Sequence, residues 1–319
     1  MKKATKTGLF FLMMVLFYLV VSIGIAGVLP EKYYTVNFSY IMGQLTIIIP
    51  ALVYILITRG RVLKEIPFKK IKIENAIILA VFAYVCLPIT GFLNSVTMLF
   101  TTNHVAASVG GLTENYFIVN LFMMAVLPAC MEEFVFRGII YNGLRKSGIF
   151  AAVLVSGMAF GMYHMNLNQF VYAFLMGSVF ALINEASGSM LGSMIIHFVF
   201  NLNTVISVEL LKLLPLLQKM AGESAGAVKQ AEIKTDLSGI NMQQKLIMVG
   251  VYGVLAIGAT IINVLIFKWY AKRTGKSEHI KEIFANKIQG FKSSENGRVI
   301  TVPIVLAFTI CTVMMVLLN

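Results

Sequence analysis

Residues 116–145 read YFIVNLFMMAVLPACMEEFVFRGIIYNGLR. Most of these side chains are apolar, and the stretch is longer than the roughly 20 residues that an α-helix needs to cross the hydrocarbon core of a bilayer. Two glutamates and an arginine, Glu132, Glu133 and Arg137, interrupt it beyond its midpoint. The stretch therefore predicts a membrane-spanning helix that carries ionisable side chains inside the membrane.

Comparable apolar stretches recur along the whole chain. Its 319 residues are 58% hydrophobic and 13% charged, a composition that excludes an ordinary soluble protein. Because backbone polar groups in lipid must bond within their own segment, each stretch is expected to be a helix. We predict an all-α polytopic membrane protein, a single integral membrane domain over residues 1–319. Its eight to nine transmembrane helices lie at about residues 8–29, 38–58, 76–100, 116–145, 149–164, 169–187, 190–213, 246–267 and 299–318.

The net charge of +12 follows the membrane topology. In a soluble protein it would raise the question of a nucleic-acid partner. If the N-terminus is cytoplasmic, most of the 26 lysines and arginines fall on the cytoplasmic side, at the N-terminus, at 59–73, at 137–146 and at 268–298, as the positive-inside rule requires. We expect a multi-pass protein of the cell membrane with a cytoplasmic N-terminus, whose partner is the lipid bilayer and not nucleic acid.

The remaining segments contain no recognisable soluble domain. We predict an extracytoplasmic loop at 214–245 and a basic cytoplasmic loop at 268–298, each with a surface helix. The first 30 residues begin like a signal peptide, but their apolar run is too long for one, so we expect an uncleaved first span. The three cysteines lie in apolar segments without a C-x-x-C pair, which indicates neither a disulfide framework nor a thiolate metal site.

Ionisable residues are confined to the central spans. The apolar stretches of the other spans contain none, whereas the fourth to seventh spans contain Glu132, Glu133, Arg137, His164, Glu185, His197 and Glu209. Such side chains are costly in lipid, so they normally face a cavity or each other and mark function. We therefore predict a four-helix catalytic core at 116–213. Close helix packing is expected at two pairs of small residues, Gly157 with Gly161 and Gly188 with Gly192.

Helical spacing separates the two adjacent glutamates. Glu133 and Arg137 are four residues apart and can form an ion pair on one face. Glu132 points about 100° away and stays outside that pair. A free carboxylate shielded from bulk water can accept a proton from a water molecule that attacks a carbonyl group. These residues favour hydrolysis, and no activated serine or cysteine nucleophile stands out.

Two further motifs contribute the other polar groups. His164 follows Phe160 by four residues in the fifth span, and His197 precedes Asn201 by four residues in the seventh, so each pair shares one helix face. The histidines can orient the attacking water or protonate the leaving amine. The Asn201 amide can donate to the developing oxyanion, a contribution of about 3 kcal/mol.

The same residues admit a metal ion. Glu132, His164 and His197 would be a familiar zinc set with a fourth position open for water. A His-Glu-x-x-His motif is absent, however, and asparagine is an unusual zinc ligand. We favour catalysis without a cofactor, and a zinc-dependent version of the same reaction is the alternative.

The three motifs resemble those of the CPBP family of intramembrane proteases, also called the type II CAAX-prenyl endopeptidase or Abi family. That family carries Glu-Glu-x-x-x-Arg, Phe-x-x-x-His and His-x-x-x-Asn on successive core helices. This sequence has each of them, at 132–137, 160–164 and 197–201. Each motif alone is weak evidence, whereas the ordered set on membrane helices is fairly specific.

The resemblance implies a role for each motif residue. Glu132 would be the general base, His164 and His197 would position water and the transition state, and Asn201 would serve the oxyanion. The supporting residues would be Glu133, Arg137 and Phe160. The substrate would be a membrane-embedded or lipidated peptide or protein. Eukaryotic members remove the last three residues of prenylated CAAX proteins, and other members are linked to peptide maturation or bacteriocin self-immunity.

Two other classes of protein stay open. A transporter or proton channel could use the same glutamate and histidines as a relay, but polar residues along several helices, or repeated halves, would then be expected. A non-catalytic immunity or scaffold protein would tolerate the replacement of Glu132. Family members have been labelled metalloproteases and have also been proposed to act without metal, so the resemblance leaves zinc open.

Overall fold

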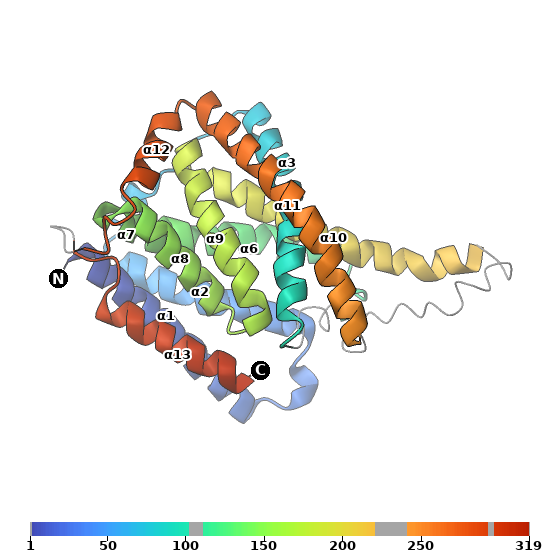
Figure 1. The fold of residues 1–319 in the computed structure, drawn as a ribbon. Helices are drawn as coiled ribbons and strands as arrows, with labels where there is room; N and C mark the ends of the chain where they lie inside the picture. The colour runs from blue at the N-terminus through green and yellow to red at the C-terminus, as the bar shows by residue number, and fades with distance from the viewer. Residues whose placement is uncertain (1, 102–110, 221–240, 293–296, 319) are drawn as a thin grey trace.

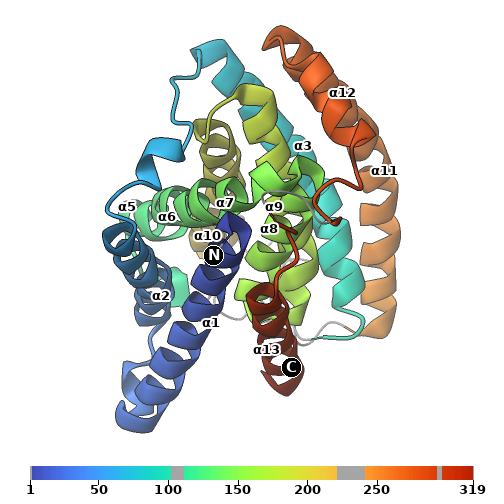
Figure 2. The ribbon, with the colours of Figure 1, turned by 90° about the vertical axis from the view of Figure 1, so that its left-hand side faces the viewer.

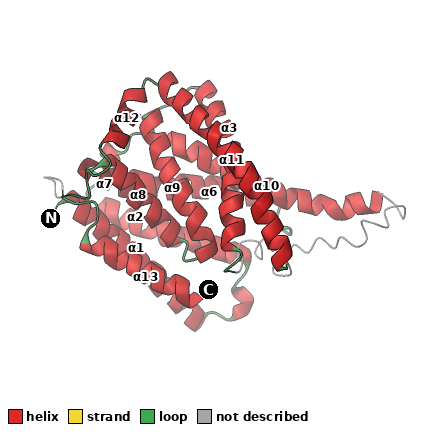
Figure 3. Cartoon of the chain, viewed as in Figure 1, coloured by secondary structure: helices red, strands yellow, loops and turns green. Residues whose placement is uncertain are grey.

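The chain folds into helices joined by short turns. The computed structural model describes residues 2–101, 111–220, 241–292 and 297–318, and these ranges contain no strand (Figure 3). The all-α prediction is confirmed. The longer helices are α1 (Lys3–Val28), α2 (Val36–Ile57), α3 (Ile73–Thr97), α8 (Ile149–Tyr163), α9 (Leu167–Ser187), α10 (Leu191–Met220), α11 (Met242–Arg273) and α13 (Val302–Leu318).

Among the described residues, seven helical segments are long and apolar enough to cross a membrane. They are α1, α2, α3, the fourth span at Phe117–Ser147, α9, the first part of α10 and α11. Helices α8 and α13 are also apolar but have only 15 and 17 residues. Each predicted span corresponds to one of these helices, and the chain is a multi-pass membrane protein.

Helices α8 and α9 pack along each other in the middle of the bundle. α3 pairs with α11 on one side of them and α1 with α13 on the other (Figures 1 and 2). α10 packs against α3, α9 and the fourth span, and α2 also contacts the fourth span. The helices that carry the three motifs are therefore neighbours, and α2 lies beside them.

The close contact of α8 with α9 depends on two glycines. An added Cβ at Gly157 would lie 2.2 Å from the Oγ of Ser178, and one at Gly161 would lie 2.8 Å from a backbone carbonyl oxygen of α9. Close packing at this pair is confirmed. The prediction of close packing is wrong for Gly188. This glycine ends α9 with a φ of 69°, a left-handed conformation that favours glycine.

The fourth span is not a regular α-helix. Pro128 lacks an N–H, and its ring crowds the carbonyl four residues earlier, which explains a widened turn just before it. The two glutamates of the motif lie on the regular helical turn between two wider segments. The successive pieces are α5 (Phe117–Asn120), π-helical turns at Leu121–Val126, α6 (Leu127–Glu133), π-helical turns at Phe134–Tyr141 and α7 (Asn142–Leu144).

The segment predicted as an extracytoplasmic loop at 214–245 contains more helix than expected. α10 continues into it as far as Met220, because leucine-rich sequence favours helix even beyond the span. α11 starts within the segment as well, directly after Asn241, whose side chain forms a capping box with Gln244. The rest of this predicted loop, 221–240, lies outside the described residues.

The basic segment at 268–298 also begins as helix, because α11 runs to Arg273. A short amphipathic helix follows, α12 (Ser277–Ala285), which buries Ile280 and Ile283 and contacts α8, α9 and α11. The predicted surface helix is confirmed for this segment.

Ion pairs tie the basic segments together at one end of the bundle, which we call the basic end. Lys3 of α1 pairs with Glu65 of the segment after α2, and Arg273 at the end of α11 pairs with Glu74 at the start of α3. Arg137, which the charge distribution also assigns to the cytoplasmic side, is only 2% exposed. It lies inside the bundle, where an acidic partner neutralises it.

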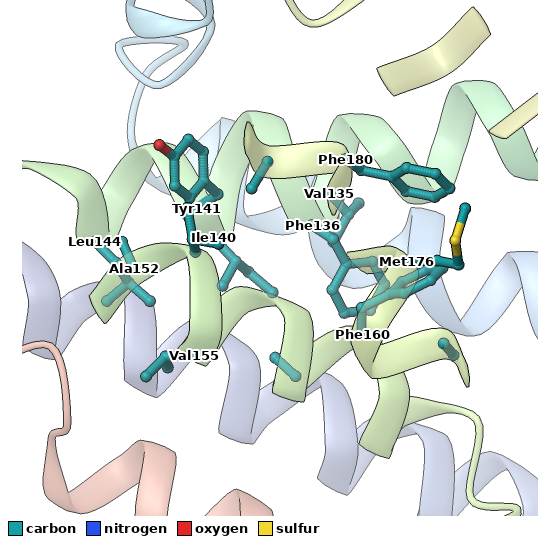
Figure 4. Close-up of a cluster of buried hydrophobic side chains, with 14 of the residues drawn as sticks. Val135, Phe136, Ile140, Tyr141, Leu144, Ala152, Val155, Phe160, Met176 and Phe180 are labelled. Carbon is teal, nitrogen blue, oxygen red and sulfur yellow. The ribbon is translucent and has the colours of Figure 1, made fainter. Parts of the chain in front are cut away.

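Aromatic rings fill the space where the fourth span, α8 and α9 meet. Phe136 packs edge-on against Phe160 with ring centroids 5.2 Å apart, and Phe160 lies 6.3 Å from Phe180 (Figure 4). All three side chains are buried. They form the apolar frame around the polar site.

Candidate active site

Glu133 and Arg137 form an ion pair inside this frame. The Nη1 of Arg137 donates to the Oε1 of Glu133 at 2.9 Å, and both side chains are completely buried. The guanidinium carbon lies 4.3 Å from the ring centroid of Phe160 and 4.9 Å from that of Phe180, a favourable cation–π geometry. The predicted ion pair is confirmed.

His197 of α10 lies between the two glutamates. Its Nδ1 is 2.9 Å from the Oε1 of Glu133, and its Nε2 is 3.9 Å from the Oε2 of Glu132. Its ring stacks on Phe180 with centroids 5.2 Å apart and meets Phe160 edge-on at 5.8 Å. Phe180 therefore covers one face of the imidazole, and packing as well as hydrogen bonding fixes the orientation of the ring.

His164 caps the C-terminal end of α8. Its Nδ1 lies 2.8 Å from the carbonyl oxygen of Phe160, one turn earlier, and its ring meets the Phe160 ring edge-on at 4.9 Å. It is close enough to Glu132 and His197 to interact with both electrostatically. The structure thus places His197 beside Glu132 and His164 within electrostatic range of it, and Phe160 contacts both histidines.

Gln44 of α2 is a site residue that the sequence analysis missed. Its Nε2 donates to the Oε1 of Glu132 at 3.0 Å, and the side chain is buried. Tyr40, one turn earlier on α2, also interacts electrostatically with Glu132. The available signal was a glutamine inside a span that has no ionisable residue, because a buried amide in lipid needs a partner.

Asn201 takes no part in the hydrogen bonds that the structure describes among the other motif residues. It lies one turn beyond His197 on α10 and is half-buried, so the two residues share the predicted helix face. In the described part of the chain, no hydrogen bond joins its amide to Glu132, His164 or His197. Its role at the oxyanion stays a prediction.

The other acidic residues of these spans lie elsewhere. Glu209 pairs with Lys212 on the same helix at 2.6 Å. Glu185 accepts hydrogen bonds from Tyr141 and Arg145 near the basic end of the bundle. Neither carboxylate belongs to the cluster around Glu132, and both have structural partners.

The predicted zinc ligands are not arranged as a metal site. In the ranges that the structure describes, no three His, Cys, Asp or Glu residues are grouped so that they could hold a metal ion. Both histidines use Nδ1 for a protein hydrogen bond, to Glu133 and to the Phe160 carbonyl. If Glu132 bound a metal ion, His164 and His197 would therefore have to bind it through their Nε2 atoms.

The arrangement can perform acid–base chemistry. Glu132 has a side-chain exposure of 13%, Glu133 has none, and only Glu132 has an imidazole nitrogen opposite it that makes no protein hydrogen bond. Two adjacent carboxylates thus have different environments, one neutralised by an arginine and the other open to a reactant. That division is typical of a catalytic base beside a supporting residue.

Comparison with known protein families agrees with this geometry. Residues 114–203 match the family described as Rce1-like, Type II CAAX prenyl endopeptidase Rce1-like. The matched residues contain the three motifs, from Glu132 to Asn201. A search of curated proteins found no match, nor did a search of solved structures. The helical core at these residues is therefore similar to the type II CAAX prenyl endopeptidase, or CPBP, family of membrane proteases, and that family indicates a peptidase.

Proposed function

We propose that the protein is an intramembrane endopeptidase that hydrolyses a peptide bond of a membrane-embedded or lipidated peptide or protein. Glu132 activates the attacking water molecule. The observation that carries this proposal is the 3.9 Å separation of the Glu132 Oε2 from the His197 Nε2, beside a Glu133 that is neutralised by Arg137. This distance is too long for a direct hydrogen bond and suits two groups that share one water molecule.

The hydrogen bonds define which atoms can take part. A carboxylate oxygen only accepts, so the proton on His197 lies at Nδ1, where it faces Glu133. The Nε2 of His197 is then the atom that faces the reactant. Gln44 holds the Oε1 of Glu132, which leaves Oε2 as the oxygen that meets the water. We assign His164 to the same water or the transition state, and Asn201 to the oxyanion.

The reaction is an ordinary hydrolysis. Glu132 takes a proton from water while the water oxygen forms a bond to the carbonyl carbon of the peptide. The proton then passes to the peptide nitrogen as the C–N bond breaks. One water molecule is consumed, and the products are a carboxylate end and an amine end.

We test this proposal by comparing peptide ends in cells that carry the parent protein, Glu132→Gln or Glu209→Gln. The second variant is a matched control, because it removes one charge from an α10 residue paired with Lys212. Loss of a general base lowers the rate by about 10²–10⁴-fold, so ends made by the parent and the control should disappear with Glu132→Gln. Identical ends in all three would instead indicate a non-catalytic immunity or scaffold protein.

We propose further that the protein lies in the cell membrane with its N-terminus in the cytoplasm.

We also propose that hydrolysis needs no metal ion. Metal analysis of the purified active protein before and after chelator treatment tests this proposal. Activity that survives in metal-free protein supports it. Stoichiometric zinc that is lost together with activity would establish the zinc-dependent alternative, with Glu132, His164 and His197 as the ligands.

A further inference from the structure

A cavity lies at the basic end of the bundle. Its volume is about 260 Å³. Four parts of the chain line it, which are the segment after α2, the end of the fourth span, the turn between α9 and α10, and the turn before α12 with the first residues of that helix. The lining includes none of the residues proposed to act on the peptide. We call this cavity the basic pocket.

The basic pocket has more positive than negative side chains. Its lining contains the carboxylate of Glu185 and the cations Lys69, Arg137, Arg145 and Lys276, besides His279. Both oxygens of the carboxylate are already used. The Oε1 accepts from Tyr141 at 2.7 Å and from the Nε of Arg145 at 2.9 Å, and the Oε2 lies 2.6 Å from the Nε2 of His279.

Lys69 and Lys276 have no acidic partner in the described part of the chain. Arg137 is neutralised by Glu133, and Arg145 by Glu185. The two lysines therefore leave the basic pocket with about two uncompensated positive charges. Lysine ammonium groups are common point-charge ligands of phosphate.

The backbone holds both lysines in place. The N–H of Lys69 donates to the Oγ of Ser189 at 3.0 Å, and that hydroxyl donates back to the Lys69 carbonyl at 2.6 Å. Lys276 lies directly after a turn that Thr274 fastens to the end of α9, by a 2.6 Å hydrogen bond to the carbonyl of Ala186. The backbones near both lysines are thus held at the turn between α9 and α10.

We infer that the basic pocket binds the phosphate group of an anionic ligand at the membrane surface, held by Lys69 and Lys276. Basic pockets between membrane helices are a recognised type of binding site for phospholipid headgroups. The same chemistry would also accept free phosphate from solution. The inference does not depend on the proposed hydrolysis, because it concerns other side chains and its readout is binding.

The test uses the full-length protein in detergent and measures bound lipid by native mass spectrometry during titration with phosphatidylglycerol or phosphatidylcholine. The pocket variant is Lys69→Gln with Lys276→Gln. The matched control is Lys64→Gln with Lys272→Gln, which removes the same charge from exposed residues outside the lining. We expect the pocket variant to bind phosphatidylglycerol about tenfold to thirtyfold more weakly, and the control to change less than threefold.

Two further arms complete the test. Replacement of both lysines by arginine keeps the charges and should restore binding, which separates a lost site from a misfolded protein. Inorganic phosphate that displaces the lipid at millimolar concentration would assign the site to the free phosphate group, whereas lipid binding that resists it would assign the headgroup. Equal loss in the pocket variant and the control, or loss in neither, would overturn the inference.

Discussion

Two clusters in this molecule are built from the same three side chains and differ in their surroundings. Each contains one carboxylate, one guanidinium and one imidazole: the inner cluster of Glu133, Arg137 and His197, and the outer cluster of Glu185, Arg145 and His279. The inner acid and arginine have no exposed side-chain surface and the histidine has 6%. In the outer cluster the arginine side chain is 35% exposed and the histidine 32%.

The difference shows that burial, and not composition, decides what such a cluster does. Water can solvate Arg145 and His279 if their partner is lost, so the outer cluster acts as a fastening between α9, the end of the fourth span and α12. The side chain of Arg137 has no exposed surface, so its charge depends on the ionised Glu133 beside it. The inner cluster therefore holds His197 in position next to Glu132, with its Nδ1 facing Glu133.

The largest expected effect comes from removing each carboxylate in turn. Glu133→Gln should lower the free energy of unfolding by about 3–5 kcal/mol, because it leaves Arg137 uncompensated. Glu185→Gln should lower it by only about 1–2 kcal/mol, since its partners can be rehydrated. Reversible unfolding by sodium dodecyl sulfate in mixed micelles measures both. Equal losses would show that burial does not distinguish the two clusters.

A smaller effect is expected from Gln44→Leu, which removes the contact that extends the inner cluster to α2. A hydrogen bond to a charged group contributes about 1.5–3 kcal/mol, so peptide hydrolysis should fall by roughly 10- to 100-fold while the protein stays folded. The measurement is the rate at which the Glu132-dependent peptide end forms. Gln243→Leu, at an exposed position of α11, is the matched control. An unchanged rate would remove Gln44 from the site.

The smallest effect is expected from His279→Ala in the outer cluster. The hydrogen bond to Glu185 fastens α12 to α9, and its loss should speed hydrogen exchange of the α12 amides by about tenfold, or roughly 1 kcal/mol. Peptide hydrolysis should not change. Glu278→Ala, which alters an exposed neighbour, is the control and should leave α12 protected. Lost hydrolysis in His279→Ala would mean that the outer cluster also serves catalysis.

Much of the fold could be predicted from the sequence, because long apolar runs in lipid have few alternatives to the helix. Each predicted span corresponds to a helix in the described residues. The Glu133–Arg137 ion pair also followed from spacing alone. The boundary of α10 could not be placed, because the sequence beyond the bilayer still favours helix.

Gln44 could not be predicted from the sequence, because a neutral amide gives a weaker signal in an apolar span than an ionisable side chain. The widened turns of the fourth span depend on Pro128 and on packing between helices, which one-dimensional spacing does not contain. The basic pocket requires four distant segments to meet, and only the fold brings Lys69 to Lys276. Asn201 was expected close to Glu132, and no hydrogen bond joins the two in the described residues.

The packing of Phe160 and Phe180 around Arg137 and His197 also sets how the molecule responds to its ionic surroundings. At physiological ionic strength, dissolved salt screens exposed charges over about 8 Å, but the side chains of the inner cluster are buried. The attraction within the inner cluster should therefore be the same in dilute and concentrated salt. Attraction of anions to the lysines of the basic pocket should weaken as salt rises.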